Sequence, residues 1–406
     1  MRDTLKILFL AHRLPYPPNK GDKIRSFHEL EHLSRRHRVW CATFVDDPAD
    51  LPHVTRLEDY CQAVAAVPLS RTRATARGFW HQLRGGTATE GFYADRRMGA
   101  LLRGWARTVC FDAVVVFSSG MAPYGLECPA RRRVLDFCDW DSAKWAEYAR
   151  RGGLRGRLFG VEARRLAQRE VHWARRYDAC TIITQQEAAD RQHAALDEHP
   201  VVVRNGVGLR PLAPLPAEPR VGFVGAMDYP PNVDAVCWFA EEIWPGVRAR
   251  CPEARFQIVG RRPGRRVRRL AEHPGIEVVG EVSAVGAYLD GFAVAIAPLR
   301  IARGLQNKAL EAMAAGRPLV LTPAAARGIG AEHGRQYLIA EDPVRFAAQV
   351  TALLADRRRA AALGEAARAF VADHFDWRRE MAKLEALLAQ PPAAVAPPAA
   401  PAPVAC

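Results

Sequence analysis

The sequence predicts an α/β fold of two Rossmann-like domains, each built on a doubly wound parallel sheet, with a cleft between them. Short apolar runs alternate with helical patterns through both halves of the chain, as is typical of buried parallel strands joined by helices. The 406 residues exceed what one ordinary core accommodates. A Pro-rich segment at residues 211–219 separates the halves, which indicates an interdomain linker.

The first half predicts strands at five apolar runs: 5–11, 39–44, 112–117, 133–138 and 179–184. A helix at 24–36 follows the first strand, and the β-α-β order implies right-handed crossovers. The Arg-rich residues 70–107 predict a helical insertion on the surface. Residues 142–177 predict a long, strongly basic helical stretch.

The second half repeats the plan, with strands expected at 221–225, 255–260, 276–279, 292–298 and 318–321. Helices are expected between them at 233–250, 264–271 and 305–315, and a helical region at 343–372 follows the last strand. We therefore expect a first domain at 1–198 and a second at 199–374. A final helix at 375–390 crosses back to the first domain. Residues 391–406, almost entirely Pro and Ala, predict a disordered tail.

Composition narrows the class of protein. No apolar run approaches the ~20 residues of a membrane-spanning helix, and the N-terminus lacks a signal peptide pattern, so we expect a cytoplasmic protein. The nine cysteines contain no Cys-x-x-Cys pair, which favours reduced core cysteines and no metal site. The net charge of +14 favours polyanions, acidic lipid head groups or phosphorylated substrates.

The strongest chemical signal lies at residues 298–318, where a strand leads through a loop with Gly304 into a helix. A helix N-terminus presents free N–H groups to a diphosphate. Lys308 adds a charge in the first turn, and Glu311, three residues on, can accept two hydrogen bonds from a ribose diol. The alternative is an exposed ion pair between Lys308 and Glu311.

Two loops at the ends of first-domain strands predict the other half of the site. Residues 12–26 form a Pro-stiffened loop in which Lys20, Gly21 and Asp22 precede a helix; the alternative is a rigid turn with solvated charges. Asp139 follows a strand and faces the predicted cleft. Asp139 and Asp141 also form the sequence Asp-x-Asp, which is a weak indication of metal binding. Asp141 and Ser142 alternatively cap the next helix.

The segment 298–318 resembles the nucleotide-sugar site of the retaining glycosyltransferases of family four, which have the GT-B fold. Leu310-Glu311-Ala312-Met313-Ala314 matches the second acid of the family's paired glutamates, which implies that Glu311 binds the ribose. The first glutamate, which contacts the donor sugar, falls on Arg303, a departure from the pattern. The run 202–207 is similar to the family's strand-Asn-Gly-Val signature.

The resemblance assigns roles to further residues. Gly225 matches the family's glycine, but the Arg and Lys that follow it are missing, so Lys308, Arg303 or Arg261 supply the positive charge. We assign donor binding to the following residues: Gly225, Asn232, Gly260, Arg261, Gly304, Asn307 and Glu311. We assign catalysis to the following residues: Asp139, Lys308 and Arg303. Asp139 is the nearest match to a His beside the reacting carbon.

The chain also resembles the sugar transferases of exopolysaccharide clusters that accompany an exosortase and PEP-CTERM sorting. This implies transfer of a sugar from a nucleoside-diphosphate sugar to an acceptor hydroxyl, with retention and without metal or cofactor. The alternatives are a nucleotide-sugar epimerase of the same fold and a non-catalytic nucleotide-sugar-binding protein. The expected acceptor is a glycan or is linked to polyprenyl diphosphate. The Arg-rich stretch 150–176 predicts contact with an anionic membrane surface, or else a solvated helix. No nucleic-acid recognition motif is present.

Overall fold

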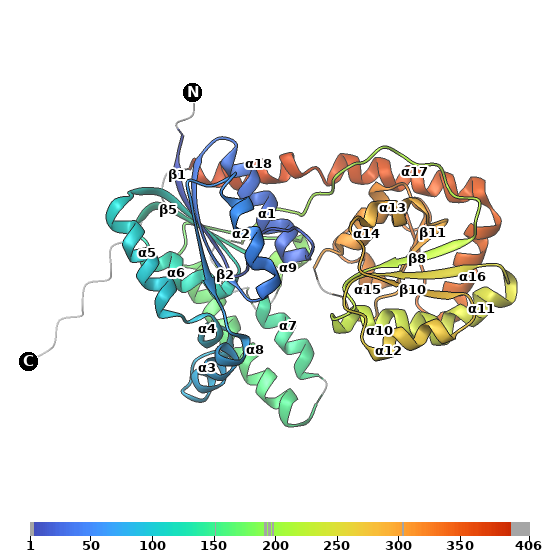
Figure 1. The fold of residues 1–406 in the computed structure, drawn as a ribbon, viewed down its shortest axis with the longest axis horizontal. Helices are drawn as coiled ribbons and strands as arrows, with labels where there is room; N and C mark the ends of the chain where they lie inside the picture. The colour runs from blue at the N-terminus through green and yellow to red at the C-terminus, as the bar shows by residue number, and fades with distance from the viewer. Residues whose placement is uncertain are drawn as a thin grey trace, which may run out of the picture.

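A computed structural model describes residues 4–150, 152–190, 193, 196, 199–302 and 304–390. It contains two parallel sheets, one in each domain, which stand side by side (Figure 1). The first sheet has the order β3-β2-β1-β4-β5-β6-β7 and the second the order β10-β9-β8-β11-β12-β13. Both are doubly wound sheets with helical crossovers, as predicted.

The first sheet consists of β1 Lys6–Ala11, β2 Arg38–Val45, β3 Ala63–Pro68, β4 Phe111–Phe117, β5 Ala130–Cys138, β6 Ala179–Ile182 and β7 Val201–Val202. Its helices are α1 Gly21–Ser34, α2 Val54–Leu57, α3 Arg71–Leu83, α4 Ala88–Tyr93, α5 Arg96–Thr108, α6 Ala122–Glu127, α7 Asp141–Ala149, α8 Gly153–Ala174 and α9 Gln185–Ala188. The strand β3 was not predicted, because its Ala-rich sequence has little strand propensity and it lies at the sheet edge.

The second sheet consists of β8 Arg220–Val224, β9 Arg255–Val259, β10 Ile276–Gly280, β11 Val294–Ala297, β12 Leu319–Leu321 and β13 Leu338–Ile339. Its helices are α10 Pro230–Trp238, α11 Trp244–Arg250, α12 Arg265–Arg268, α13 Val285–Asp290, α14 Asn307–Ala314, α15 Pro323–Ala326, α16 Pro343–Ala355 and α17 Arg357–His374. The single helix expected at 233–250 is interrupted by the π-helical segment Phe239–Ile243. Pro245, which has no N–H to donate, explains this interruption.

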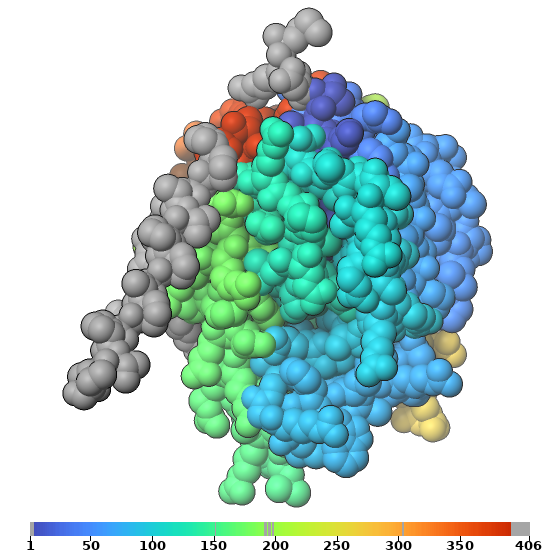
Figure 2. Space-filling view, turned by 90° about the vertical axis from the view of Figure 1, so that its left-hand side faces the viewer, coloured from blue at the N-terminus to red at the C-terminus, as the bar shows by residue number. Residues whose placement is uncertain are grey.

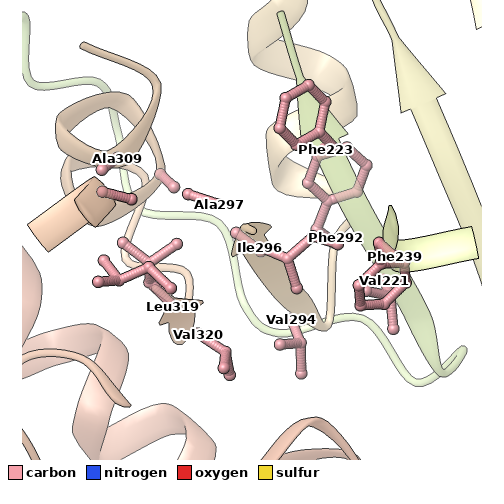
Figure 3. Packing of buried hydrophobic residues seen from close by; sticks show 14 of the residues in the cluster. Val221, Phe223, Phe239, Phe292, Val294, Ile296, Ala297, Ala309, Leu319 and Val320 are labelled. Atoms are coloured by element: carbon pink, nitrogen blue, oxygen red, sulfur yellow. The ribbon is translucent and has the colours of Figure 1, made fainter. Parts of the chain in front are cut away.

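Side chains from both faces of each sheet are buried. In β1, Leu8 and Leu10 join one apolar cluster, whereas Ile7 and Phe9 join another on the opposite face. In the second domain, Val294 and Ile296 of the central strand β11 are buried among side chains from its neighbours (Figure 3). Sheets buried on both faces show continuous apolar strands, which is why the sequence predicted most of them.

The chain crosses between the domains twice, and the two crossings lie side by side. Val207 donates its N–H to the carbonyl of Phe375 at 2.8 Å, and the N–H of Arg204 donates to Glu380 at 2.8 Å. The helix α18 Trp377–Leu388 then packs beside α1 on the first domain (Figure 1). Its Leu384 and Leu387 belong to the apolar cluster of that sheet.

Two expectations about domain organisation change. The strand β7 pairs with β6, so the first sheet continues past the expected boundary at residue 198. The Pro-rich segment 211–219 is held against the second domain, because Arg317 donates to the carbonyl of Pro214 at 3.2 Å and Arg357 to that of Pro216 at 2.6 Å. The segment that crosses between the domains is therefore 203–207, and 211–219 is part of the second domain's surface.

The basic stretch predicted at 142–177 is divided into two helices. α7 and α8 are separated at Gly152 and Gly153, whose φ angles of +73° and +70° are left-handed. They form a hairpin at the end of the first domain away from α18 (Figure 1). None of the helices within the described ranges is long and apolar enough to cross a membrane. The tail predicted at 391–406 lies outside the described residues.

Candidate active site

The interdomain site is formed where loops after the first-domain strands contact loops after the second-domain strands. Among the described residues, three that are not glycine have left-handed backbone at these strand ends: Ser118 (φ +81°), Cys138 (φ +61°) and Arg262 (φ +54°). Such conformations cost about 1–3 kcal/mol each and concentrate at functional sites. The strain therefore marks the same edges of the two sheets that the sequence predicted for ligand binding.

Asp139 of the first domain and Gly304 of the second are in direct contact. A Cβ atom added to Gly304, whose φ is +60°, would lie 2.4 Å from Oδ1 of Asp139. That oxygen is buried, and it accepts no hydrogen bond from the described part of the chain. Burial and the neighbouring Asp141 raise the pKa of Asp139. Oδ1 of Asp139 is thus a buried acceptor atom without a donor from the described residues at the domain boundary, and the role of Asp139 in the site stays a prediction.

Neither Asp141 nor Ser142 caps α7, contrary to the alternative interpretation. The N-cap residue is Trp140, which makes no side-chain cap. The carboxylate of Asp141 accepts the hydroxyl hydrogen of Ser119, and the N–H of Ser142 donates to Glu170 at 3.1 Å. In the described ranges, no three His, Cys, Asp or Glu side chains group as metal ligands.

The loop that precedes α1 is held by ion pairs and approaches α14. Arg13 donates to Asp22 and, at 3.0 Å, to Asp46. Although burial acts to raise it, the hydrogen bond from His12 and the charge of Arg13 hold the pKa of Asp22 well below its usual range. A Cβ atom on Gly21 would lie 3.6 Å from Nδ2 of Asn307. Asp22 therefore stabilises the loop, whereas Gly21 lies close to the second domain's helix. Lys20 is the half-buried N-cap residue of α1.

A buried arginine connects this loop to the second domain. Arg25 donates from Nε and Nη2 to the carboxylate of Asp136, at 2.5 and 3.0 Å. Its Nη1 donates to the carbonyl of Val203 at 2.7 Å and to Oδ1 of Asn205 at 3.2 Å. Asn205 in turn donates to Oδ1 of Asn307 at 2.9 Å. These contacts position the N-terminus of α14 relative to the first domain.

Lys308 and Glu311 lie on α14 as predicted, but they do not form the exposed ion pair of the alternative interpretation. Both are half-buried. The Nζ of Lys308 donates to Oδ1 of Asn232 at 2.6 Å and lies 5.4 Å from the ring centroid of Phe223. Burial lowers the pKa of Lys308 to about 8 and raises that of Glu311 to about 7. Two ionisable groups perturbed toward neutral pH are typical of a functional site.

The glycines predicted for donor binding allow two loops to approach each other. A Cβ atom on Gly260 would lie 1.7 Å from the carbonyl oxygen of Gly225, so only glycine fits there. Arg261 accepts a hydrogen bond at its carbonyl from Met227 at 2.9 Å, while its Nε is buried without a partner within the described residues. Asn232 is buried and donates to the carbonyl of Ala226 at 2.9 Å. It therefore positions both this loop and Lys308.

Arg262 contributes a contact that the sequence did not predict. It forms ion pairs with Asp47 of the first domain at 2.5 Å and with Asp228 at 3.6 Å. The sequence carries no signal for this contact, because Asp47 is 215 residues away along the chain. Arg303, which was assigned to catalysis, lies outside the described residues.

Comparison with known proteins identifies the second domain. Residues 218–356 match the family model of glycosyl transferases group 1. The second domain is a glycosyl transferases group 1 domain. This match confirms the predicted resemblance of the second domain to glycosyltransferases and the prediction of a glycosyltransferase.

Solved glycosyltransferase structures share the GT-B fold of the whole chain. HepE of Anabaena, solved in complex with UDP and glucose, superposes with a TM-score of 0.67 at 16% identity, over 95% of this chain and 99% of that one. Sucrose-phosphate synthase of Thermosynechococcus elongatus gives 0.69 at 17% identity, over 94% and 98%. TarM gives 0.68 at 12% identity, over 96% and 99%. The predicted GT-B fold is thereby confirmed.

A curated relative is similar over a shorter stretch. An uncharacterised 44.6 kDa protein in the cps region of Klebsiella pneumoniae is 27% identical over 139 residues. The aligned stretch covers 32% of this glycosyltransferase and 36% of the Klebsiella protein, so the chain matches about a third of that relative's length.

Proposed function

We propose that this glycosyltransferase transfers a sugar from a nucleoside-diphosphate sugar to an acceptor hydroxyl, with retention of the anomeric configuration. The observation that carries the proposal is the placement of Lys308 and Glu311, half-buried at the start of α14, beside the boundary at which Asp139 meets Gly304. HepE, which shares the fold, was solved with UDP-glucose. The resemblance of 310–314 to the retaining family supports retention.

The start of α14 suits a diphosphate. The start of a helix presents N–H groups that have no partner within the helix, together with the positive end of the helix dipole. Lys308 adds a charge in the first turn of the helix. The buried Nε of Arg261, with no partner in the described structure, is a further donor for an anion. In this proposal these groups stabilise the charge that develops on the departing nucleoside diphosphate.

Two carboxyl groups complete the proposed site. Glu311, ionised, accepts hydrogen bonds from the two ribose hydroxyls of the donor. Asp139 stands beside the reacting carbon, where a carboxylate stabilises the positive charge that accumulates as the bond to the diphosphate oxygen breaks. The acceptor oxygen then bonds to the same carbon, and the proton of its hydroxyl passes to the departing diphosphate oxygen. No cofactor takes part in these steps.

We predict a bell-shaped pH dependence of kcat/KM for the donor. Glu311 must be deprotonated to accept both hydroxyls, so kcat/KM rises as the pH increases through about 7. Lys308 must be protonated to attract the diphosphate, so kcat/KM falls as the pH increases through about 8. Steady-state rates across this range check the prediction. Glu311→Gln should abolish the rise of kcat/KM near pH 7. Lys308→Arg should shift the fall of kcat/KM to higher pH. A profile that keeps both limbs in both variants would contradict the assignment.

A product assay separates this function from the two alternatives. Purified protein is incubated with UDP-glucose, and in parallel with donors of the other bases, and the nucleotide and sugar products are resolved by chromatography. Release of a nucleoside diphosphate, together with sugar transferred to acceptor or to water, supports the glycosyltransferase. A donor whose sugar has changed configuration while it stays attached indicates an epimerase. Tight donor binding without any product indicates a binding protein.

We also propose that the acceptor belongs to a cell-surface glycan, either a glycan chain or a sugar linked to polyprenyl diphosphate. The Klebsiella relative is described by its place in a cps region, and a variant of TarM was solved with α-GlcNAc-glycerol, Fondaparinux and UDP. The resemblance to transferases of exopolysaccharide clusters also favours a cell-surface glycan as the acceptor. Comparing membrane-extracted lipid acceptors with soluble glycans in the product assay tests this assignment.

A further inference from the structure

Exposed apolar side chains gather at one end of the first domain. Eleven large hydrophobic side chains are exposed in the described residues, and five of them lie on α3 and on the first turns of α8. On α3 these are Phe79 (47% exposed), Trp80 (59%) and Leu83 (56%). On α8 they are Leu154 (80%) and Leu158 (42%). We call residues 79–84 and 154–158 the helical tip.

Hydrogen bonds make the two parts of the helical tip one surface. The side chain of Gln82 donates to the carbonyl of Leu158 at 3.1 Å. One turn further along α8, the carboxylate of Glu162 accepts from the N–H of Thr89, at 2.9 Å, and Arg165 donates to the carbonyl of Gln82 at 2.6 Å. Figure 2 shows the two segments next to each other at the lower end of the first domain, where α8 begins at the projecting edge.

The helical tip is cationic as well as apolar. Residues 70–86 and 148–161 contain no Asp or Glu. Arg84, Arg155 and Arg157 are exposed, and none of the three forms an ion pair with another described residue. Their charges are therefore available to an external anion, in contrast to Arg169, which pairs with Glu90 at 2.7 Å.

We propose that the helical tip docks on an anionic phospholipid membrane. Trp and Phe are favoured at the level of lipid head groups, where an amphipathic surface also buries Leu side chains. Unpaired arginines around such a surface complement acidic head groups. The tip is a projection of two helices, which suits insertion into a lipid interface. Apolar burial and charge attraction thus act at the same place.

This surface differs from the stretch 150–176 that the sequence indicated. Trp173 is buried in the core of the first domain, and Trp145 packs against Phe159 with ring centroids 5.3 Å apart. The side chain of Arg165 donates a hydrogen bond within the protein, to the carbonyl of Gln82. The later turns of α8 therefore hold the fold together, and only its first turns join α3 at the helical tip. Delivery of a lipid-linked acceptor to the interdomain site is a consequence that rests on the proposed function, whereas docking itself does not.

Vesicle flotation of the full chain tests the proposal. Vesicles of phosphatidylcholine alone are compared with vesicles that also contain phosphatidylglycerol. The wild type should float with the anionic vesicles and remain with the buffer when only phosphatidylcholine is present. The triple variant Trp80→Ser, Leu83→Ser, Leu154→Ser should bind anionic vesicles at least about tenfold more weakly, because burial of each side chain contributes strongly to partitioning. Arg84→Glu with Arg155→Glu should weaken binding by roughly fivefold or more per residue.

A matched control removes an equally exposed apolar side chain elsewhere. Val344 is 72% exposed on α16 of the second domain, and Val344→Ser should leave flotation unchanged. Unchanged flotation of the triple variant would overturn the proposal. The proposal would also be overturned if light scattering showed a dimer for the wild type and a monomer for the triple variant. The helical tip would then be an interface between two copies of the chain. Nucleotide binding is measured on the same samples, so that failure of the proposed function is recognised separately.

Discussion

Arg25→Met is expected to lower the free energy of unfolding by about 3–5 kcal/mol. The guanidinium of Arg25 is fully buried and neutralises Asp136, which is also fully buried. Burial alone would raise the pKa of Asp136, but the charge of Arg25 outweighs it and lowers that pKa. Methionine fills a similar volume without supplying a charge, so the variant leaves a buried carboxylate without its cation. Urea unfolding followed by circular dichroism measures the loss.

A surface arginine at the C-cap of the same helix is the control for Arg25. The side chain of Arg35 is 53% exposed, and it forms an ion pair at 3.0 Å with Glu31, which lies one helical turn earlier. Exposed pairs of this kind contribute about 0.3–0.5 kcal/mol, so Arg35→Met should barely move the unfolding transition. A loss for Arg25→Met no larger than that of Arg35→Met would show that Asp136 is stabilised without its arginine.

Lys308→Met is expected to reduce kcat by about 10²–10³ while weakening donor binding less. Removing a group that stabilises the developing charge of a transition state typically costs this much. Lys308 is held by Asn232 at 2.6 Å, so its charge is positioned before the reaction. The steady-state rate of nucleoside-diphosphate release at saturating donor measures kcat, and calorimetric titration of the donor measures affinity.

Lys383→Met serves as the control for Lys308, because Lys383 is a lysine of α18 that is not among the residues assigned to the donor site and pairs with Glu380 at 2.7 Å. Its turnover should match the wild type. Equal turnover of Lys308→Met and the wild type would remove Lys308 from the catalytic groups, and a loss confined to affinity would leave it a ground-state contact only.

The strands of the fold were largely predictable because most are buried on both faces and show as continuous apolar runs. β3 was missed because it is an Ala-rich edge strand, whose formation depends on pairing with β2. The break between α7 and α8 was visible as Gly152-Gly153 in the sequence, but the stretch was interpreted as continuous. The π-helical segment near Pro245 had a similar local signal.

The sequence alone indicates candidate site residues where these residues share a local motif. Gly304, Lys308 and Glu311 follow one strand, and that order alone indicated an anion site at a helix start. Contacts between the domains were not predictable, since Arg25 and Asn205 are 180 residues apart and nothing local records their hydrogen bond. The helical tip was missed on α3 for a related reason: exposure depends on what covers a helix, and the sequence of α3 alone does not contain that information.

Calorimetric titration with UDP, GDP, ADP, TDP and CMP, on the wild type and on Glu311→Ala, tests the proposed donor site most directly. We predict that one nucleoside diphosphate binds the wild type. Glu311→Ala should bind it at least about tenfold more weakly, because it loses charge-assisted hydrogen bonds to the ribose. Circular dichroism should show that the variant keeps the wild-type fold. Equal affinity in both proteins, or no binding of any nucleotide to the wild type, would contradict the placement of the donor at α14.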